Sequence, residues 1–422
     1  MSRRVRTVTM ILLAWMLIIV LRLVYLQVYQ YDWMVERARS QQQKVVETGL
    51  VRGLIVDRAG IELARSIDTE SFFAVPDEII DIEATSKRLG VILGQDAKEI
   101  SARLRNAKND SRKFLWIARQ VEADKAVAIN RMKLAGIYSR DELKRYYPNG
   151  SLAAHVLGFV GTDDVGLAGV ERVYNDKLNG RAGEIYLDTD GMRRTYGSTY
   201  GSIDASGNSG KIVVLTVDQT VQHWTEQALA GALKQTHAKS ATAIVLDPRT
   251  GEILALANAP TFDPNLAHAI NPRERVNNAL QNIYEPGSTL KIIAYSAAIE
   301  EKIARPDELI NCQMGQINVN GRIVHDHKPF GILSVTEALA KSSNVAAIKL
   351  GLRVGDARMY AYLTRFGFGS RTGIELPGET SGLLRPLARW SRTSIGSIAI
   401  GQEIGVTPLQ MVTAFGSLTN DG

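Results

Sequence analysis

The sequence predicts an α+β protein carried on a single N-terminal transmembrane helix. Of its 422 residues, 45% are hydrophobic and 22% are charged, which supplies ample material for a core and excludes disordered, collagen-like and low-complexity classes. One apolar run near the N-terminus is long enough to cross a membrane. Short strand and helix patterns alternate along the rest of the chain. At about 150 residues per domain, the length suggests two or three domains.

The charge pattern and the cysteine content exclude several function classes. The 50 lysines and arginines against 44 aspartates and glutamates give a net charge of +6. No run concentrates this charge on one segment, as a nucleic-acid binder would, so we expect no nucleic-acid partner. The single cysteine, Cys312, excludes an intramolecular disulfide framework and any zinc or iron–sulfur site built from several cysteines. No glycine-rich phosphate-binding loop is present.

The first predicted element is a membrane anchor. Residues 7–26 form an apolar run interrupted only by Thr9 and Arg22, and about 20 helical residues span the hydrocarbon layer of a bilayer. The alternative is a cleaved signal peptide, which needs small residues after the apolar segment, whereas residues 21–33 are bulky. The arginines before the run place the N-terminus in the cytoplasm and the bulk of the chain across the membrane; they are Arg3, Arg4 and Arg6.

Small α+β modules are predicted between the anchor and the middle of the chain. Residues 27–46 are polar and helix-prone, and residues 52–64 are typical of a strand, a tight turn and a second strand. Apolar residues at helical spacing predict helices within 77–106 and 121–134. Another helix begins near Gly169. These modules contain no nucleophile–base pair and no metal-ligand cluster in the sequence.

A glycine- and serine-rich stretch, residues 196–210, predicts a linker and a domain boundary. The pattern after it predicts a strand over 212–217 and a helix capped by Asp218 or Thr220. A β-hairpin is predicted over residues 241–258, because a proline and a glycine occupy the positions that its turn favours.

A serine and a lysine stand together in a helix-rich region that begins near residue 272. Pro286 and Gly287 mark a turn, Ser288 falls in the first helical turn, and Lys291 follows three residues later on the same face. A serine hydroxyl is a poor nucleophile until a base takes its proton. Burial at a helix N-terminus favours the neutral form of a lysine. This pairing predicts an acylation apparatus, although S-x-x-K alone usually marks only a solvated helix turn.

The surroundings of this pair are specific. P-G-S-T-x-K ends at Lys291, and K-S-S-N-V follows at residues 341–345. This combination strongly resembles the penicillin-binding transpeptidases. Segments similar to landmarks of their catalytic domain are 246–257, 372–379 and 405–410. Segments similar to the membrane-proximal pedestal of class B members are 52–64, 145–150 and 166–180.

The resemblance implies a fold and a domain order. It implies an α+β architecture in which residues 1–26 form a cytoplasmic tail and transmembrane anchor. Residues 27–210 would form an elongated α+β pedestal of the penicillin-binding-protein dimerisation type. Residues 211–422 would form a transpeptidase domain like that of the serine β-lactamases, with a helical region and an antiparallel sheet that lacks its last strands.

The resemblance also implies a role for each motif residue. Ser288 would be the acylated nucleophile and Lys291 its general base. Ser342 would relay a proton to the leaving or incoming amine, and Asn344 would hold Lys291 and the substrate backbone. The reaction implied is attack on the D-Ala-D-Ala amide of a peptidoglycan stem peptide, followed by aminolysis by a neighbouring stem. β-Lactams would acylate the same serine, and no cofactor is implied.

The implied setting is the inner membrane of a bacterium, with the bulk of the chain in the periplasm. Partners implied there are the membrane itself, a membrane glycosyltransferase and the division machinery. The sequence layout around residues 147–180 is more similar to that of proteins of septal wall synthesis than to that of elongation-type proteins.

The family's third motif, K-[ST]-G, does not occur in this sequence, since no lysine follows Lys349. Arg371-Thr372-Gly373 imitates it but lies inside another landmark, upstream of where the family places the motif. The strand that bears the motif supplies one oxyanion-hole donor, whose loss typically costs ~10²–10³ in rate. We therefore expect residues 1–422 to be inactive as written, with an unstable last domain, as in a truncated gene product.

Two other function classes stay open. The chain could be a non-catalytic, membrane-anchored partner of the wall-synthesis machinery, or a β-lactam sensor or hydrolase, against which the class B-like pedestal argues. Smaller features are interpreted without a chemical role. We expect His325-Asp326-His327 to be a solvated loop or cleft rim, Cys312 an incidental thiol, and residues 163–164 and 188–190 surface turns.

Overall fold

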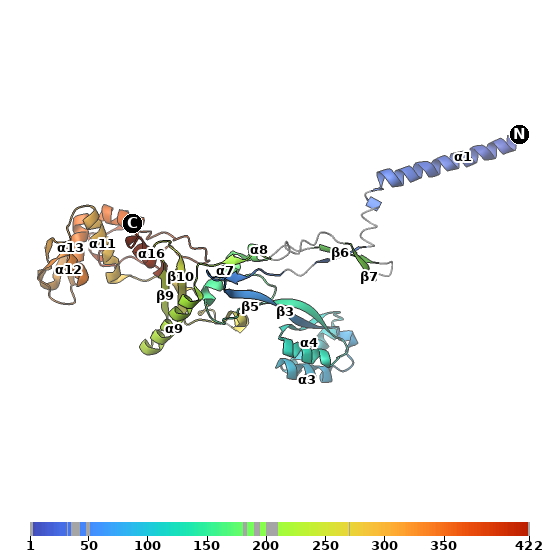
Figure 1. The fold of residues 1–422 in the computed structure, drawn as a ribbon, viewed down its shortest axis with the longest axis horizontal. Helices are drawn as coiled ribbons and strands as arrows, with labels where there is room; N and C mark the ends of the chain where they lie inside the picture. The colour runs from blue at the N-terminus through green and yellow to red at the C-terminus, as the bar shows by residue number, and fades with distance from the viewer. Residues whose placement is uncertain are drawn as a thin grey trace. The chain divides into compact units, whose positions relative to one another are not determined.

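The computed structural model describes residues 3–31, 33–34, 43–47, 51–179, 184–189, 195–199, 210–269 and 271–420 (Figure 1). Its contacts divide the chain into two compact units. Unit 1 comprises residues 1–52 and 179–211, and unit 2 comprises residues 53–178 and 212–422. All four sequence-predicted site residues belong to unit 2.

The N-terminal helix of unit 1 corresponds to the predicted anchor. α1 (Arg3–Val24) continues into the π-helical turn η1 (Tyr25–Tyr29). Its segment Val8–Tyr29 has a mean hydropathy of 2.4 and is long and apolar enough to cross a membrane, and no second helix in the described ranges meets that criterion. The structure therefore has the single N-terminal helix that a membrane anchor requires.

Unit 1 also holds a small antiparallel sheet that differs from the prediction. β1 (Gln43–Glu47), β6 (Glu184–Thr189) and β7 (Thr195–Thr199) pair in the order β1-β6-β7. The helix expected around β1 and the linker expected at β7 are therefore wrong, and Asp188 lies in a strand rather than a turn. Pairing with neighbouring strands overrides local composition here. Outside the described residues lie residues 35–42 of the helix-prone stretch, residues 200–209 of the predicted linker, and Asp190.

A five-stranded sheet begins unit 2, with β3 paired to β5, β4 and β2, and β2 paired in parallel to β8. Its strands are β2 (Ile55–Val56), β3 (Glu62–Ala74), β4 (Leu115–Val121), β5 (Ile137–Tyr146) and β8 (Val213–Val214). The predicted turn between β2 and β3 is present, because the Asp57 carboxylate accepts the backbone N–H groups of Ala59 and Ile61 at 2.8 and 2.9 Å. β4 and β5 were not predicted, and β8 is shorter than the predicted strand.

Three helices pack against this sheet, and α3 and α4 lie together beside the end of β3 (Figure 1). They are α3 (Ile82–Leu93), α4 (Ala97–Asn109) and α5 (Ala123–Arg131), preceded by the 3₁₀ turn η2 (Pro76–Glu78). The first predicted helix is split in two because Gly94 adopts a φ of 66° that ends α3. Buried apolar side chains join helices and sheet, among them Phe72, Leu89, Ile100, Leu104 and Ile117.

Short helices connect the sheet to the rest of unit 2. They are α6 (Ala154–Leu157), α7 (Gly169–Val173) and α8 (Asn175–Leu178). Arg145 of β5 donates from Nε to the Glu171 carboxylate of α7 at 2.6 Å, and both side chains are fully buried. Arg145 also donates to the Gly53 carbonyl at 2.7 Å. Because a buried charge is costly without its partner, this pair fixes α7 to the sheet.

The predicted hairpin is confirmed as β9 (Ala241–Leu246) paired with β10 (Ile253–Ala259). α9 (Gln219–Thr236) packs on it and begins at the predicted cap, since Asp218 accepts the N–H groups of Thr220 and Val221 at 2.9 and 3.1 Å.

A helical region follows the hairpin and has its own core, whose members include Leu290, Tyr295, Val345, Ile348 and Ile398. Its helices are α10 (Asn278–Gln281), α11 (Lys291–Glu300), α12 (Val335–Ala340), α13 (Asn344–Val354), α14 (Asp356–Arg365), α15 (Ser394–Ile398) and α16 (Pro408–Leu418). The 3₁₀ turn η3 (Pro264–Ala269) lies just before this region, which itself contains η4 (Gly287–Leu290), η5 (Gln313–Gly315) and η6 (Leu387–Arg389). Two unpredicted strand pairs complete it: β11 (Leu309–Asn311) with β14 (Ile332–Ser334), and β12 (Gln316–Val319) with β13 (Arg322–His325).

Candidate active site

Ser288 lies in the turn that opens α11, as the sequence predicts. The turn η4 holds it, and Gly287 precedes it with a φ of 58°. Gly287 donates its N–H to the Gly401 carbonyl at 3.0 Å, and a Cβ on Gly401 would lie only 2.0 Å from the Gly287 oxygen. Two glycines are therefore required where these backbones meet. The Ser288 side chain is exposed and makes no hydrogen bond with the described residues.

Lys291 is the first residue of α11 and is almost completely buried, with 1% of its surface exposed. Its Nζ donates to the Ser342 carbonyl at 2.5 Å and to Ser342 Oγ at 2.9 Å. Burial lowers the pKa of Lys291 to about 8, and the negative charge of Asp326 opposes that fall. A substantial fraction of the lysine is therefore neutral near pH 7–8.

The two bonds to Ser342 leave the lysine ready to act as a base. A neutral amine has two hydrogens and one lone pair, and the two oxygens of Ser342 accept both hydrogens. The lone pair is then available to a hydroxyl proton from elsewhere in the site. Ser288 stands one helical turn before Lys291 and supplies such a hydroxyl.

The turn 341–343 joins α12 to α13 and presents Ser342. This residue has a φ of 55°, a left-handed conformation that costs a non-glycine residue energy and commonly marks a functional site. Ser343 caps α13 by accepting the Ala346 N–H at 3.1 Å. Asn344 donates its side-chain amide to the His325 carbonyl at 2.8 Å.

The structure brings only some of the four predicted site residues into direct contact. Lys291 and Ser342 are in direct contact, and Ser288 shares a turn with Lys291. Asn344 is held by His325 rather than by Lys291. The roles assigned to these four residues stay predictions.

Asp326 is the site residue that sequence reasoning missed. Its carboxylate accepts the Ser343 hydroxyl at 2.9 Å, the Val345 N–H at 3.1 Å and the Asn344 N–H. The solvated-loop interpretation is therefore wrong for Asp326, which is half-buried, and for His325, which ends strand β13, although it describes the exposed His327. No local pattern reveals this contact, because its partners lie on another element.

The segment Arg371-Thr372-Gly373 lies in a loop rather than on a strand. Thr372 donates its N–H and its hydroxyl to the Glu379 carboxylate at 2.7 and 2.6 Å. Its polar groups are therefore committed to the loop itself.

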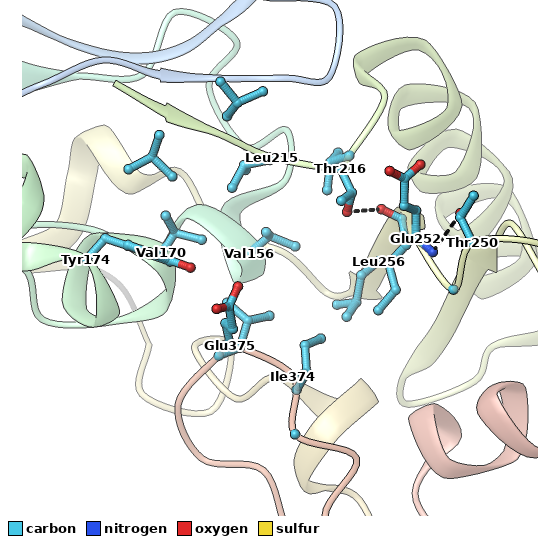
Figure 2. Close-up of a pocket in the computed structure, with 17 residues that line it drawn as sticks. Val156, Val170, Tyr174, Leu215, Thr216, Thr250, Glu252, Leu256, Ile374 and Glu375 are labelled. Atoms are coloured by element: carbon cyan, nitrogen blue, oxygen red, sulfur yellow. Dashed lines mark hydrogen bonds between the residues drawn. The ribbon is translucent and has the colours of Figure 1, made fainter. Parts of the chain in front are cut away.

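Two cavities in the described part of the chain are not lined by these residues. Figure 2 shows one of about 530 Å³, lined largely by aliphatic side chains and by Thr216, whose hydroxyl donates to the Ile253 carbonyl at 2.8 Å. A neighbouring cavity of about 540 Å³ lies beside the hairpin turn. Neither cavity holds a nucleophile next to a base. The candidate site is therefore identified by its reactive side chains and not by a cavity. Within the described ranges, no group of three His, Cys, Asp or Glu side chains could hold a metal ion.

Comparison with known families matches two parts of the chain. Residues 241–422 match the penicillin binding protein transpeptidase domain, and residues 50–215 match the penicillin-binding protein dimerisation domain.

Individual relatives are similar along almost the whole chain. Peptidoglycan D,D-transpeptidase FtsI of Escherichia coli is 32% identical over 95% of this chain and 68% of its own length. Probable peptidoglycan D,D-transpeptidase PenA of Neisseria meningitidis is 33% identical over 96% of this chain and 69% of its own length.

Solved structures are similar to the fold as well. A peptidoglycan synthetase from Bifidobacterium adolescentis superposes with a TM-score of 0.65 at 26% identity, covering 90% of this chain and 73% of that one. Penicillin binding protein 3 of Mycobacterium tuberculosis in complex with aztreonam gives a TM-score of 0.63 at 30% identity, covering 89% and 66%.

Proposed function

Since this chain belongs to the class B penicillin-binding proteins, we propose that it carries out serine acyl transfer on peptidoglycan stem peptides through Ser288. The family is that of the peptidoglycan D,D-transpeptidases. The observation that carries the proposal is the buried Lys291, bonded to Ser342 and one turn from an exposed serine.

The acylation step uses Lys291 as the base. Ser288 Oγ bonds to the carbonyl carbon of the penultimate D-Ala while its proton passes to the neutral Lys291 Nζ. The amide C–N bond then breaks, and the terminal D-Ala leaves as an amine after it takes a proton through Ser342 Oγ. An ester between Ser288 and the shortened stem peptide remains.

The second step reverses these proton transfers. The amine of a neighbouring stem attacks the ester carbonyl and loses a proton to the Ser342–Lys291 pair. The bond to Ser288 Oγ breaks and the hydroxyl is restored. The 2.9 Å contact between Lys291 and Ser342 supports this relay, since it is already within proton-transfer distance. Asn344 would orient the substrate backbone.

A β-lactam would stop the reaction at the ester stage. Fluorescent penicillin added to membranes that contain the full chain should label the protein through Ser288, and Ser288→Ala should remove the label. Ser296→Ala, two turns further along the same helical segment, is the matched control and should keep it. Labelling that survives Ser288→Ala would remove Ser288 from its role.

Inactivity of residues 1–422 as written stays a prediction, and the same labelling tests it. If the wild-type chain stays unlabelled but co-purifies with a membrane glycosyltransferase, the non-catalytic alternative is favoured.

We also propose a setting for the reaction. The three arginines before the apolar helix support a cytoplasmic N-terminus, with the bulk of the chain outside the inner membrane; they are Arg3, Arg4 and Arg6. A membrane glycosyltransferase and division proteins are the partners proposed, and a septal role is preferred to an elongation role. Similarity to FtsI over 95% of the chain supports that preference.

A further inference from the structure

Asp326 stands immediately after β13, where the β12–β13 hairpin ends against α13. Its own N–H donates to the Gly315 carbonyl at 2.8 Å, so its backbone is fixed from the side of η5. Its carboxylate accepts three donors from consecutive residues, namely the Ser343 hydroxyl and the N–H groups of Asn344 and Val345. Residues distant in the sequence therefore meet at one carboxylate.

These contacts fix the backbone that presents Ser342. The N–H groups at the start of α13 lack partners within the helix, and an anionic acceptor there is favoured by the helix dipole. Ser343 is fully buried, so its hydroxyl bond to Asp326 is shielded from water. The residue before it, Ser342, has the unfavourable φ of 55° and needs such external support.

We propose that Asp326 is a positioning residue for acylation, which holds the turn 342–344 in register with Lys291. The inference rests on the proposed function for its effect on rate. His325 supports the same turn by accepting the Asn344 side-chain amide at 2.8 Å. The end of the β12–β13 hairpin therefore holds both the backbone and the Asn344 side chain of the motif at residues 341–345.

The charge of Asp326 gives the proposal a second readout. Asp326 interacts electrostatically with Lys291, with Tyr295 on α11 and with Cys312 before η5, and Lys349 of α13 acts on Cys312. Among them, Asp326 supplies the negative charge that opposes the effect of burial on the pKa of Lys291. Removing that charge should lower this pKa further below about 8.

Two variants separate position from charge. Asp326→Ala removes the acceptors and the charge together. Asp326→Asn keeps an oxygen for the two backbone N–H groups, and its amide can donate to the Ser343 hydroxyl, so only the charge is lost. Asp218→Ala is the matched control, because Asp218 also accepts two backbone N–H groups at a helix start, at 2.9 and 3.1 Å, away from the site.

The experiment measures penicillin acylation rates of the full chain and the titration of Lys291 by NMR with ¹³C-labelled lysine, the signal being assigned by its loss in Lys291→Arg. We expect Asp326→Ala to slow acylation roughly a hundred-fold, because displaced catalytic groups cost about that much. Asp326→Asn should stay within about ten-fold of wild type with a lower Lys291 pKa. Asp218→Ala should acylate at the wild-type rate.

Acylation of Asp326→Ala at the wild-type rate would overturn the proposal, and so would an equal loss in Asp218→Ala. If the wild-type chain does not acylate at all, the proposed function fails instead, and the Lys291 titration then decides through the comparison of the two variants. A Lys291 pKa that differs between Asp326→Ala and Asp326→Asn, which lose the same charge, supports the positioning contact, and equal values in the two variants refute it.

Discussion

The α11–α13 helical cluster and strand β9 differ sharply in how they are packed. In α13 the side chains of Val345, Ile348 and Leu350 are 0% exposed, whereas every residue of β9 is only half-buried. β10 is buried over most of its length against α9 and its neighbours. Lys291 and Ser342, the proposed base and proton relay, stand at the ends of well-packed helices. The proposed site therefore lies on the packed helical cluster and not on β9.

The largest effect is expected from removal of the proposed general base, Lys291. Lys291→Met should lower the rate of penicillin acylation by about 10³-fold, since general-base catalysis contributes 10²–10⁴. Stopped-flow or gel-based acylation kinetics with the wild-type chain as reference would measure it. Because methionine fills the buried site, the melting temperature should change little, and retention of the full rate would show that another group is the base.

A matched pair of core substitutions tests the difference in packing between α13 and β9. Ile348→Ala in α13 should destabilise the protein by about 2–5 kcal/mol, because it leaves a cavity in a fully buried core. Ile244→Ala on half-buried β9 should cost clearly less. Urea unfolding followed by circular dichroism compares the two variants, and equal losses of stability would show that the two sites are packed alike.

The pH dependence of acylation tests the state of Lys291. The protonated lysine cannot accept the Ser288 proton, and its pKa is lowered to about 8. The rate should therefore rise about ten-fold per pH unit below that pKa and level off above it. A profile that is flat from pH 5 to pH 9 would contradict a lysine base.

An exposed ion pair gives the smallest expected effect. Arg58, in the turn after β2, meets Glu252 beside the hairpin at 3.3 Å, and both side chains are about 40% exposed. Arg58→Ala should change the free energy of unfolding by less than about 1 kcal/mol and leave acylation unaffected. A loss of several kcal/mol would mean that the hairpin depends on this contact.

Features carried by local chemistry could be predicted from the sequence. The Asp218 cap, the 248–251 turn and the placement of Ser288 at the start of α11 follow from residues close together in the chain. β1 and β7 were missed because their strand character comes from pairing with β6. Asp326 was missed for the same reason, since the unpredicted β12–β13 hairpin carries it to the start of α13.

The central claim is that Ser288 is the nucleophile, and mass spectrometry of the penicillin-treated full chain tests it most directly. After proteolysis, the penicilloyl group should be found on Ser288, within the peptide that contains Lys291. Ser288→Ala should carry no adduct, and Ser296→Ala should carry the wild-type adduct. An adduct on any other residue, or on the Ser288→Ala chain, would contradict the account.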